Sequence, residues 1–401
     1  MHQPDVVIVG AARTPIGKYG GSLRNVHPAD LGAAAAKAAM ARAGVSPATI
    51  DEVLIGHGRQ AGSGPNPGRQ VGVRAGIPDT VPAQTINKAC ASGMQTIATG
   101  AQSIMLGEAD VVLAGGIESM SRMPYLVDSE DARWGHKMGN FTLVDAMYRD
   151  GFTCSVCGMI MGETVEVLAR QYGITRESSD AYALESQQRA ERAIAAGRFS
   201  DEIAPITFTD AKGKPQTLAA DEHPRAGATI ESLRKLPLAF GDVEGAPGII
   251  TAGAASGVTD GGAAVVIMSA AAAKAQGVKP LARIIGWASA GVDPRIMGIG
   301  PVPAVKKLLV KTGLSLEDFD LVELNEAFAA QVLAVLKDLP IPMEKLNVNG
   351  GAIALGHPIG CTGTRIVVTL LYEMMRRKAR RGLATLCVSG GMGMAMGIEL
   401  C

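Results

Sequence analysis

The chain has 401 residues, and its 38 Lys and Arg residues balance 38 Asp and Glu residues, so the formal net charge is zero. This balance excludes a global electrostatic attraction to nucleic acid or to an anionic membrane. Aromatic residues make up only 4% while there are 50 glycines, which indicates a core in which small residues let backbones approach closely. The length predicts two or three subdomains.

The N-terminal residues and the number of cysteines indicate in which cellular compartment the protein is expected. Residues 1–5 are polar and lead directly into a short apolar stretch, without the charged region and long apolar run of a signal peptide. No apolar run reaches the ~18 residues that a membrane helix needs. Six cysteines in a chain of this size do not indicate a disulfide framework. We therefore expect a cytoplasmic protein without membrane association, whose cysteines are thiols.

Strand-like and helix-like segments alternate along most of the chain. The pattern predicts a strand at residues 6–9, a helix at 28–43, a strand at 53–56, a helix at 94–106, and strands at 109–114, 262–269, 281–288 and 321–324. This alternation is typical of an α/β fold with a mixed sheet covered on both faces. Residues 119–248 interrupt it, because they are charged and irregular, with clear helices only near 163–172 and 176–196.

The two ends of the chain share an order of features. Cys90 opens a helix followed by a strand and Gly115-Gly116, and Gly360 opens a helix followed by a strand and Gly390-Gly391. The repetition indicates two similar halves that face each other with a site between them. We expect an N-terminal core half at residues 1–118, an inserted loop domain at 119–248, the end of the N-terminal half at 249–275 and a C-terminal core half at 276–401.

Four residues in turns could carry chemistry, and each also has a structural interpretation. Cys90 lies at a helix start, where free N–H groups and the dipole lower the pKa of a thiol, but it could be a buried structural cysteine. His357 could accept a thiol proton or bind an oxyanion, or bond only to backbone. Cys387 could exchange a proton with a carbon acid or fill the core. Asn325 could be a helix N-cap, with Glu326 in the first turn.

Taken together and in this order, these motifs resemble those of the thiolase family. The resemblance extends along nearly the whole chain. It includes Gly10-Ala11-Ala12-Arg13-Thr14-Pro15, Asn66-Pro67-Gly68-Arg69-Gln70, Asn87-Lys88-Ala89-Cys90, Ala114-Gly115-Gly116-Ile117-Glu118-Ser119-Met120, Asn325-Glu326-Ala327-Phe328, Gly356-His357-Pro358 and Cys387. It implies the thiolase fold, with five α/β/α/β/α layers built from two similar halves plus an inserted loop domain.

The resemblance implies a reaction and a role for each candidate. Cys90 would be the nucleophile that accepts an acyl group, His357 would lower its pKa, and Cys387 would protonate or deprotonate the carbon next to the thioester. One oxyanion hole is implied at His357 with a water held by Asn325, and another at the backbone N–H groups of Cys90 and Ser389. The reaction is the reversible condensation of two acetyl-CoA to acetoacetyl-CoA plus CoA, or the thiolysis of another 3-ketoacyl-CoA. Coenzyme A is a substrate, and neither a cofactor nor a metal is implied.

Further positions match the family's binding residues. The inserted loop domain would bind coenzyme A beside an acyl pocket. The residues implied are Arg225, Ser232, Ala252 and Ser256 for coenzyme A, and Ile160, Met161, Met297, Ala327 and Phe328 for the acyl group. Family members assemble as homodimers or homotetramers, and residues 119–147 would fit a tetramer contact.

Several positions depart from the family pattern. Ile160 stands where a histidine is usual, and its neighbours Cys154, Val156, Cys157 and Met159 are smaller or less aromatic, which predicts a roomier acyl tunnel. Cys154 and Cys157 have the spacing of a redox or zinc pair, but lining of the pocket is favoured. Ala254 replaces an asparagine. Ser389 replaces a glycine, so its N–H can serve as a donor only if the turn has negative φ or tolerates strain.

Other functions explain the same motifs less well. A broad-range 3-ketoacyl-CoA thiolase is the close alternative, because of Ile160 and its neighbours. A ketoacyl synthase would share the fold, but it usually has a histidine where this chain has Cys387. An inactive coenzyme A-binding protein would be expected to have lost Cys90, His357 or Cys387, and all three are present.

Overall fold

The computed structural model describes residues 5–210 and 212–401, so the prediction made for Met1–Pro4 lies outside the described residues. One large mixed sheet runs through the molecule in the order β14-β15-β16-β13-β1-β12-β5-β3-β4, with β2 paired to β12. Its strands are β1 (Val6–Arg13), β2 (Gly17–Lys18), β3 (Glu52–His57), β4 (Ala83–Ile86), β5 (Val111–Ser119), β12 (Thr259–Ser269), β13 (Ala282–Gly291), β14 (Leu321–Leu324), β15 (Arg381–Val388) and β16 (Met392–Leu400).

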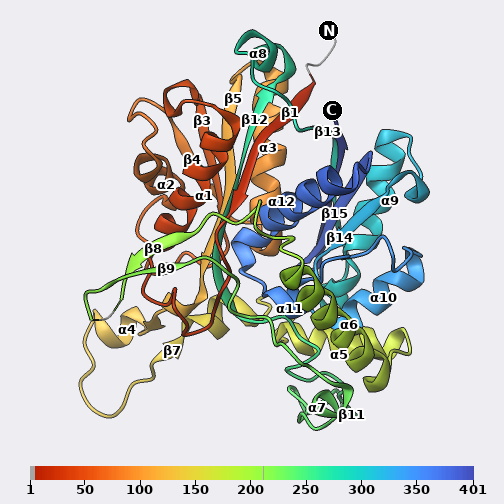
Figure 1. The fold of residues 1–401 in the computed structure, drawn as a ribbon. Helices are drawn as coiled ribbons and strands as arrows, with labels where there is room; N and C mark the ends of the chain where they lie inside the picture. The colour runs from red at the N-terminus through yellow and green to blue at the C-terminus, as the bar shows by residue number, and fades with distance from the viewer. Residues whose placement is uncertain (1–4, 211) are drawn as a thin grey trace.

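The sheet consists of two halves joined by a narrow seam. β1 pairs with β12 over most of its length, whereas it pairs with β13 only at Val7↔Arg283 and Ile8↔Ala282. One half therefore comes from the N-terminal part of the chain and β12, and the other from the C-terminal part. Figure 1 shows them as red-to-orange and blue regions on opposite sides of the molecule.

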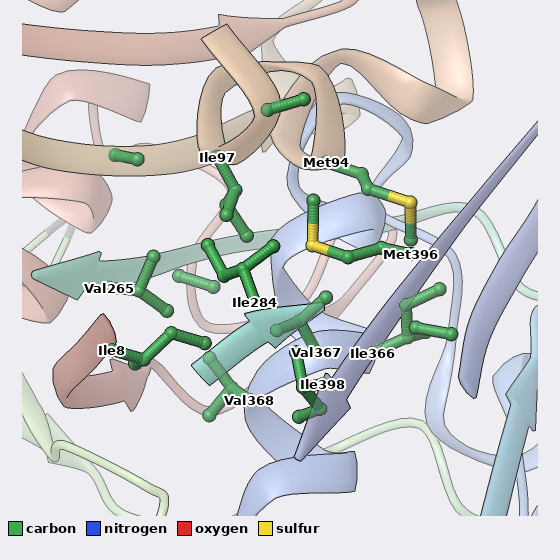
Figure 2. Packing of buried hydrophobic residues seen from close by; sticks show 14 of the residues in the cluster. Ile8, Met94, Ile97, Val265, Ile284, Ile366, Val367, Val368, Met396 and Ile398 are labelled. Atoms are coloured by element: carbon green, nitrogen blue, oxygen red, sulfur yellow. The ribbon is translucent and has the colours of Figure 1, made fainter. Parts of the chain in front are cut away.

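Helices complete five layers. α1 (Pro28–Ala43) and α2 (Pro67–Ala75) cover the outer face of the N-terminal half, α3 (Ser92–Leu106) and α12 (Ile359–Arg377) lie between the halves, and α9 (Pro301–Thr312) and α10 (Ala329–Asp338) cover the outer face of the C-terminal half. The central layer packs Ile97 and Met94 of α3 with Met396 of β16 and Val367 of α12 (Figure 2). Burial of these apolar side chains is the main force that holds the two halves together.

Glycines let the two central helices approach each other. A Cβ atom on Gly93 of α3 would lie 2.6 Å from Thr364 Oγ and 2.9 Å from Gly360 O, both on α12. A Cβ on Gly116 of β5 would lie 2.3 Å from the same Gly360 O. Because these contacts involve backbone atoms, only glycine fits there. The high glycine content therefore has a specific use at the centre of the molecule.

The segment between β5 and β12 lies along one end of both halves, in yellow and green in Figure 1. Its two long helices, α5 (Met161–Gln171) and α6 (Arg176–Ala195), pack against α10. The shorter elements are β6 (Tyr125–Leu126), α4 (Ser129–Ala132), β7 (Val144–Asp145), a π-helix (Tyr148–Phe152), β8 (Ile206–Thr209), β9 (Pro215–Leu218), α7 (Ile230–Arg234), β10 (Asp242–Val243) and β11 (Ala246–Pro247). The proposed domain boundaries stay a prediction.

Most predicted elements are present with small shifts at their ends. α1 has the predicted bounds, because His27 Nδ1 accepts from the Ala29 N–H at its start and Gly44, with φ 66°, ends it. Two more helices, α8 (Ala270–Ala275) and α11 (Ala352–Leu355), are short. Within the described ranges, no helix is long and apolar enough to cross a membrane.

The N-cap interpretation of Asn325 is wrong. α10 begins at Ala329, and four residues separate it from Leu324 at the end of β14. Glu326 is buried rather than exposed in a first turn, and its carboxylate accepts hydrogen bonds from Tyr182 Oη at 2.9 Å and Ser186 Oγ at 2.6 Å. The contact with α6, distant in sequence, therefore decides the conformation of this stretch.

Candidate active site

One cavity of about 890 Å³ lies where the start of α3, the end of β15, the loop before α12 and the inserted segment meet. It brings together most of the residues selected from the sequence. The predicted residues that line it are Cys90, Ile160, Met161, Arg225, Ala252, Ser256, Met297, Ala327, Phe328, His357, Cys387 and Ser389. The two halves and the inserted segment thus contribute to one site, as the repeated motifs indicated.

Cys90 sits on a strained turn between β4 and α3. Ala89 has φ 45°, a left-handed conformation that costs a non-glycine residue roughly 1–3 kcal/mol. The turn is held by Ser92, whose Oγ accepts from the Lys88 N–H at 2.9 Å and donates to Ala89 O at 2.6 Å. These local hydrogen bonds hold the thiol at the edge of the cavity.

The surroundings of Cys90 determine its acidity. Burial raises the pKa of the Cys90 thiol above its ordinary value, while the charge of Arg59 and the N–H groups of Ser389 and of Cys90 itself act in the opposite direction. The prediction that the helix start gives a net lowering is therefore wrong, because burial outweighs it. The two N–H groups do converge on the sulfur, in the arrangement expected of an oxyanion hole.

His357 is buried with one ring nitrogen fixed. Its Nδ1 lies 2.6 Å from Thr362 Oγ, and this hydroxyl also lies 3.0 Å from Pro358 O, to which it can only donate. The hydroxyl must then accept from Nδ1–H, which leaves Nε2 with a free lone pair. Burial and the nearby charges of Arg365 and Arg59 lower the pKa of His357 to about 3. The imidazole is therefore neutral at neutral pH, and Nε2 is its ring nitrogen with a free lone pair.

Cys387 and Ser389 belong to the turn between β15 and β16. Cys387 is buried, and burial together with the negative charge of Cys90 raises its pKa well above that of an ordinary thiol. The left-handed conformations of this turn fall on Gly390 and Gly391, with φ 86° and 84°, whereas Ser389 has no positive φ. Serine is thus compatible with the backbone here, and its N–H still reaches the Cys90 sulfur.

Two predicted residues lie apart from the cavity wall. Asn325 is buried behind it, with its own N–H bonded to Thr385 O at 2.9 Å, and its side-chain amide atoms have no partner among the described residues. Ser232 lies on α7, where its hydroxyl donates to Thr229 O at 2.7 Å, and it is not among the described residues that line the cavity.

The pocket-lining interpretation of Cys154 and Cys157 is wrong, and Val156 and Met159 do not line the described cavity either. The Cys154 N–H donates to Met159 O, and the Gly158 N–H donates to Cys154 O, both at 2.8 Å. This tight turn directs the two thiols toward each other, and Val156 is exposed. Of the unusual residues near 154–160, Ile160 alone reaches the cavity within the described chain.

The sequence analysis missed part of the cavity wall. The additional residues with large side chains include Arg59, Tyr148, Phe152, His223 and Phe240. Arg59 could have been noticed, because it closely follows the strand predicted at residues 53–56, and side chains just beyond strand ends commonly form ligand sites. Tyr148, Phe152, His223 and Phe240 come from the irregular inserted segment, where no periodic pattern indicates which way a side chain points.

Comparison with known proteins agrees with this geometry. A model of the thiolase N-terminal domain matches residues 6–271, and one of the thiolase C-terminal domain matches residues 278–400. The chain belongs to the thiolase family. This thiolase is 52% identical to an acetyl-CoA acetyltransferase of Pseudomonas aeruginosa over 392 residues, or 98% of each chain. An acetyl-CoA acetyltransferase of Cupriavidus necator is 50% identical, with 98% of this chain and 99% of that one covered.

Solved structures give the same result. The thiolase superimposes on the acetyl-CoA acetyltransferase of Bacillus anthracis with a TM-score of 0.95 and 47% identity, covering 100% of this chain and 99% of that one. It superimposes on human mitochondrial 3-ketoacyl-CoA thiolase in complex with CoA with a TM-score of 0.94 and 47% identity, covering 99% and 98%. The predicted thiolase fold and the predicted acyltransferase class are therefore confirmed.

Proposed function

We propose that this thiolase catalyses the reversible condensation of two acetyl-CoA to acetoacetyl-CoA and coenzyme A. The observation that carries the proposal is one cavity that presents two thiols, Cys90 and Cys387, beside the neutral imidazole of His357. A nucleophile and a separate acid–base group are what carbon–carbon bond formation next to a thioester requires. Relatives named acetyl-CoA acetyltransferase at about half identity support this substrate.

Each chemical step of the proposed reaction is assigned to a residue of the cavity. In thiolysis, His357 Nε2 takes the Cys90 proton and the sulfur attacks the keto carbon. The carbon–carbon bond then breaks, the electron pair leaves on the acetyl-CoA carbon, and Cys387 donates the proton that this carbon takes up. The raised pKa of Cys387 suits this role, because the group stays protonated until a strong base forms beside it. Coenzyme A finally takes the acyl group from Cys90. Its thiol proton passes to the Cys387 thiolate, and the proton held by His357 returns to the Cys90 sulfur. Condensation is the reverse.

Negative charge develops on oxygen in both halves of the reaction. The N–H groups of Cys90 and Ser389 would hold the oxyanion of the acyl-enzyme step, since both already point at the sulfur. For the other oxyanion we assign a water held by Asn325 and His357, whose Nε2 becomes an N–H donor once it has taken the Cys90 proton. The unpartnered, buried amide of Asn325 supports this assignment, because such groups commonly bind an ordered water.

Coenzyme A is proposed to enter along the inserted segment. Arg225, Ala252 and Ser256 line that side of the cavity. Arg225 supplies a positive charge for the phosphates. The assignment of Ser232 to coenzyme A stays a prediction.

A broader 3-ketoacyl-CoA thiolase is the second candidate. Ile160, Phe152 and Met297 make part of the cavity wall apolar, which suits a longer acyl chain. The similarity to human mitochondrial 3-ketoacyl-CoA thiolase supports the same alternative.

We also propose that the chain assembles as a homodimer or homotetramer. Large apolar side chains are exposed close together in sequence in the inserted segment, with Trp134 at 69% and Met138 at 90% of full exposure. Light scattering after gel filtration tests this, and Met138→Glu is expected to shift a tetramer toward dimers. An unchanged mass would contradict a tetramer contact at Met138.

The cytoplasmic location stays a prediction.

Steady-state thiolysis of 3-ketoacyl-CoAs of increasing length tests the substrate, with Cys90→Ala as the inactive control. Activity confined to acetoacetyl-CoA supports the first candidate, and activity that rises with length supports the second. Failure to cleave any of them would refute both.

A further inference from the structure

Besides the catalytic groups, the cavity wall contains a buried cation. Arg59 is only 6% exposed and lines the same cavity as Cys90 and His357. Its Nη2 donates to Gly151 O at 2.6 Å, and its Nε has no partner within residues 5–210 and 212–401. Nor does its guanidinium form an ion pair with any acidic residue that the structure describes.

The nearby carboxylate of Glu118 is already used by other groups. Glu118 Oε1 lies 3.1 Å from His57 Nε2 and accepts from the backbone N–H of Arg59 at 3.2 Å. Its Oε2 accepts from the Gly360 N–H at 2.9 Å. The guanidinium charge is thus buried without a matched anion, an arrangement that is costly unless a ligand completes it.

The position of Arg59 indicates what kind of ligand that is. Its charge is close enough to lower the pKa of both Cys90 and His357, so it lies near the reacting end of the substrate rather than near the nucleotide. Tyr148 and Phe152, the ends of the π-helix that contains Gly151, make part of the same wall. A cation within a largely apolar pocket is suited to the polar end of an otherwise apolar chain.

We propose that Arg59 binds a carboxylate carried by the acyl chain, so that this enzyme cleaves 3-ketoacyl-CoA esters of dicarboxylic acids in preference to neutral ones of equal length. The planar fork of arginine matches a carboxylate in geometry as well as in charge. The carboxylate is unchanged by the reaction. This inference rests on the proposed thiolase reaction, because it names the substrate class of the same site.

The test compares two CoA thioesters with equal carbon number, 3-ketohexanoyl-CoA and the mono-CoA thioester of 3-ketohexanedioic acid, and then longer matched pairs. The wild type is expected to have the higher kcat/KM on the carboxylated member at one chain length or more. Arg59→Met should lose about 10- to 100-fold more activity on that substrate than on the neutral one, as expected for a hydrogen bond to a charged group; any loss common to both substrates reports the effect of the guanidinium charge on Cys90 and His357. Arg59→Lys should retain part of the preference, and Arg24→Met, at an exposed position, should retain all of it.

Two results would overturn the inference. One is a wild type that prefers the neutral substrate at every length. The other is an Arg59→Met variant that loses activity equally on both substrates and whose Cys90 is alkylated by iodoacetamide with a pH dependence different from that of the wild type. This result would show that the guanidinium acts on the nucleophile and not on the substrate. Binding of the two thioesters to Cys90→Ala, measured by calorimetry with and without Arg59→Met, separates recognition from catalysis. Absence of activity on all neutral 3-ketoacyl-CoAs, with the carboxylated ones cleaved, would instead refute the proposed acetoacetyl-CoA function alone.

Discussion

Among single residues, Thr362 decides which nitrogen of His357 can act as a base. Replacing it by valine removes the acceptor for Nδ1–H while keeping the shape, so the imidazole can adopt the wrong tautomer. We expect Thr362→Val to lower kcat about 10- to 100-fold, a fraction of the full contribution of general acid–base catalysis, with little change in KM.

Thr362→Ser is the matched control, because it keeps the hydroxyl and should restore most of kcat. A Thr362→Val enzyme with normal kcat would show that the hydrogen bond does not orient the base. A loss shared equally by the serine variant would indicate a packing effect in α12 instead.

The acidity of Cys90 gives a second prediction for a single residue. Burial raises its pKa, and His357, with a pKa of about 3, supplies no imidazolium partner at neutral pH. The thiolate fraction should therefore grow with pH up to and beyond pH 9. We expect the alkylation rate of Cys90 by iodoacetamide, followed by mass spectrometry of its peptide, to rise throughout this range. A plateau below pH 8 would reveal a preformed thiolate–imidazolium pair.

Among the elements, the contact between α3 and α12 depends on Gly93. A methyl group there would lie 2.6 Å from Thr364 Oγ and 2.9 Å from Gly360 O, so the helices would have to separate. We expect Gly93→Ala to lower the free energy of unfolding by about 1–3 kcal/mol, the usual cost of overpacking a core. Because α3 follows Cys90 directly, activity should fall as well.

Gly291→Ala is the matched control for Gly93→Ala. It lies at the exposed end of β13 with no positive φ, and a Cβ there would meet only Gly391 O, at an ordinary 3.8 Å. Chemical denaturation of both variants should show a clear loss for Gly93→Ala and little change for Gly291→Ala. Equal losses would mean that the close approach of the two helices does not account for the effect.

For the molecule as a whole, Asp260 makes stability depend on pH. It lies on β12, accepts from the Ser121 N–H of the inserted segment at 2.9 Å, and burial raises its pKa to about 6. Because the folded protein holds this proton more tightly than the unfolded chain, the stabilisation is complete below about pH 4 and is lost as the pH rises through about 6. The loss is roughly 3 kcal/mol for a shift of about two pKa units.

Asp260→Asn removes this titration while keeping the acceptor for Ser121. The free energy of unfolding of the variant, relative to the wild type, should therefore increase between pH 4 and pH 7. Denaturant titrations at several pH values measure this difference. A difference that does not change with pH would show that Asp260 has an ordinary pKa.

The sequence by itself determined the order of the elements and the candidate catalytic residues that share the cavity. Helices such as α1 have clear caps and periodicity, so local interactions decide their bounds. Cys90, His357 and Cys387 were found because small-residue turns surround them in an order typical of thiolases. These features depend on residues close together in the chain, or on a pattern shared with relatives.

Only the tertiary structure decided burial, acidity and direction. The pKa of Cys90 is raised because distant segments enclose it, which no local pattern at the start of α3 indicates. Cys154 and Cys157 do not line the cavity, because their thiols contact each other and Cys154 also accepts from the Gly390 N–H of the turn between β15 and β16. The uncompensated charge of Arg59 likewise became visible only when β3, β5 and the inserted segment were seen together, since whether a charge has a partner depends on distance in space.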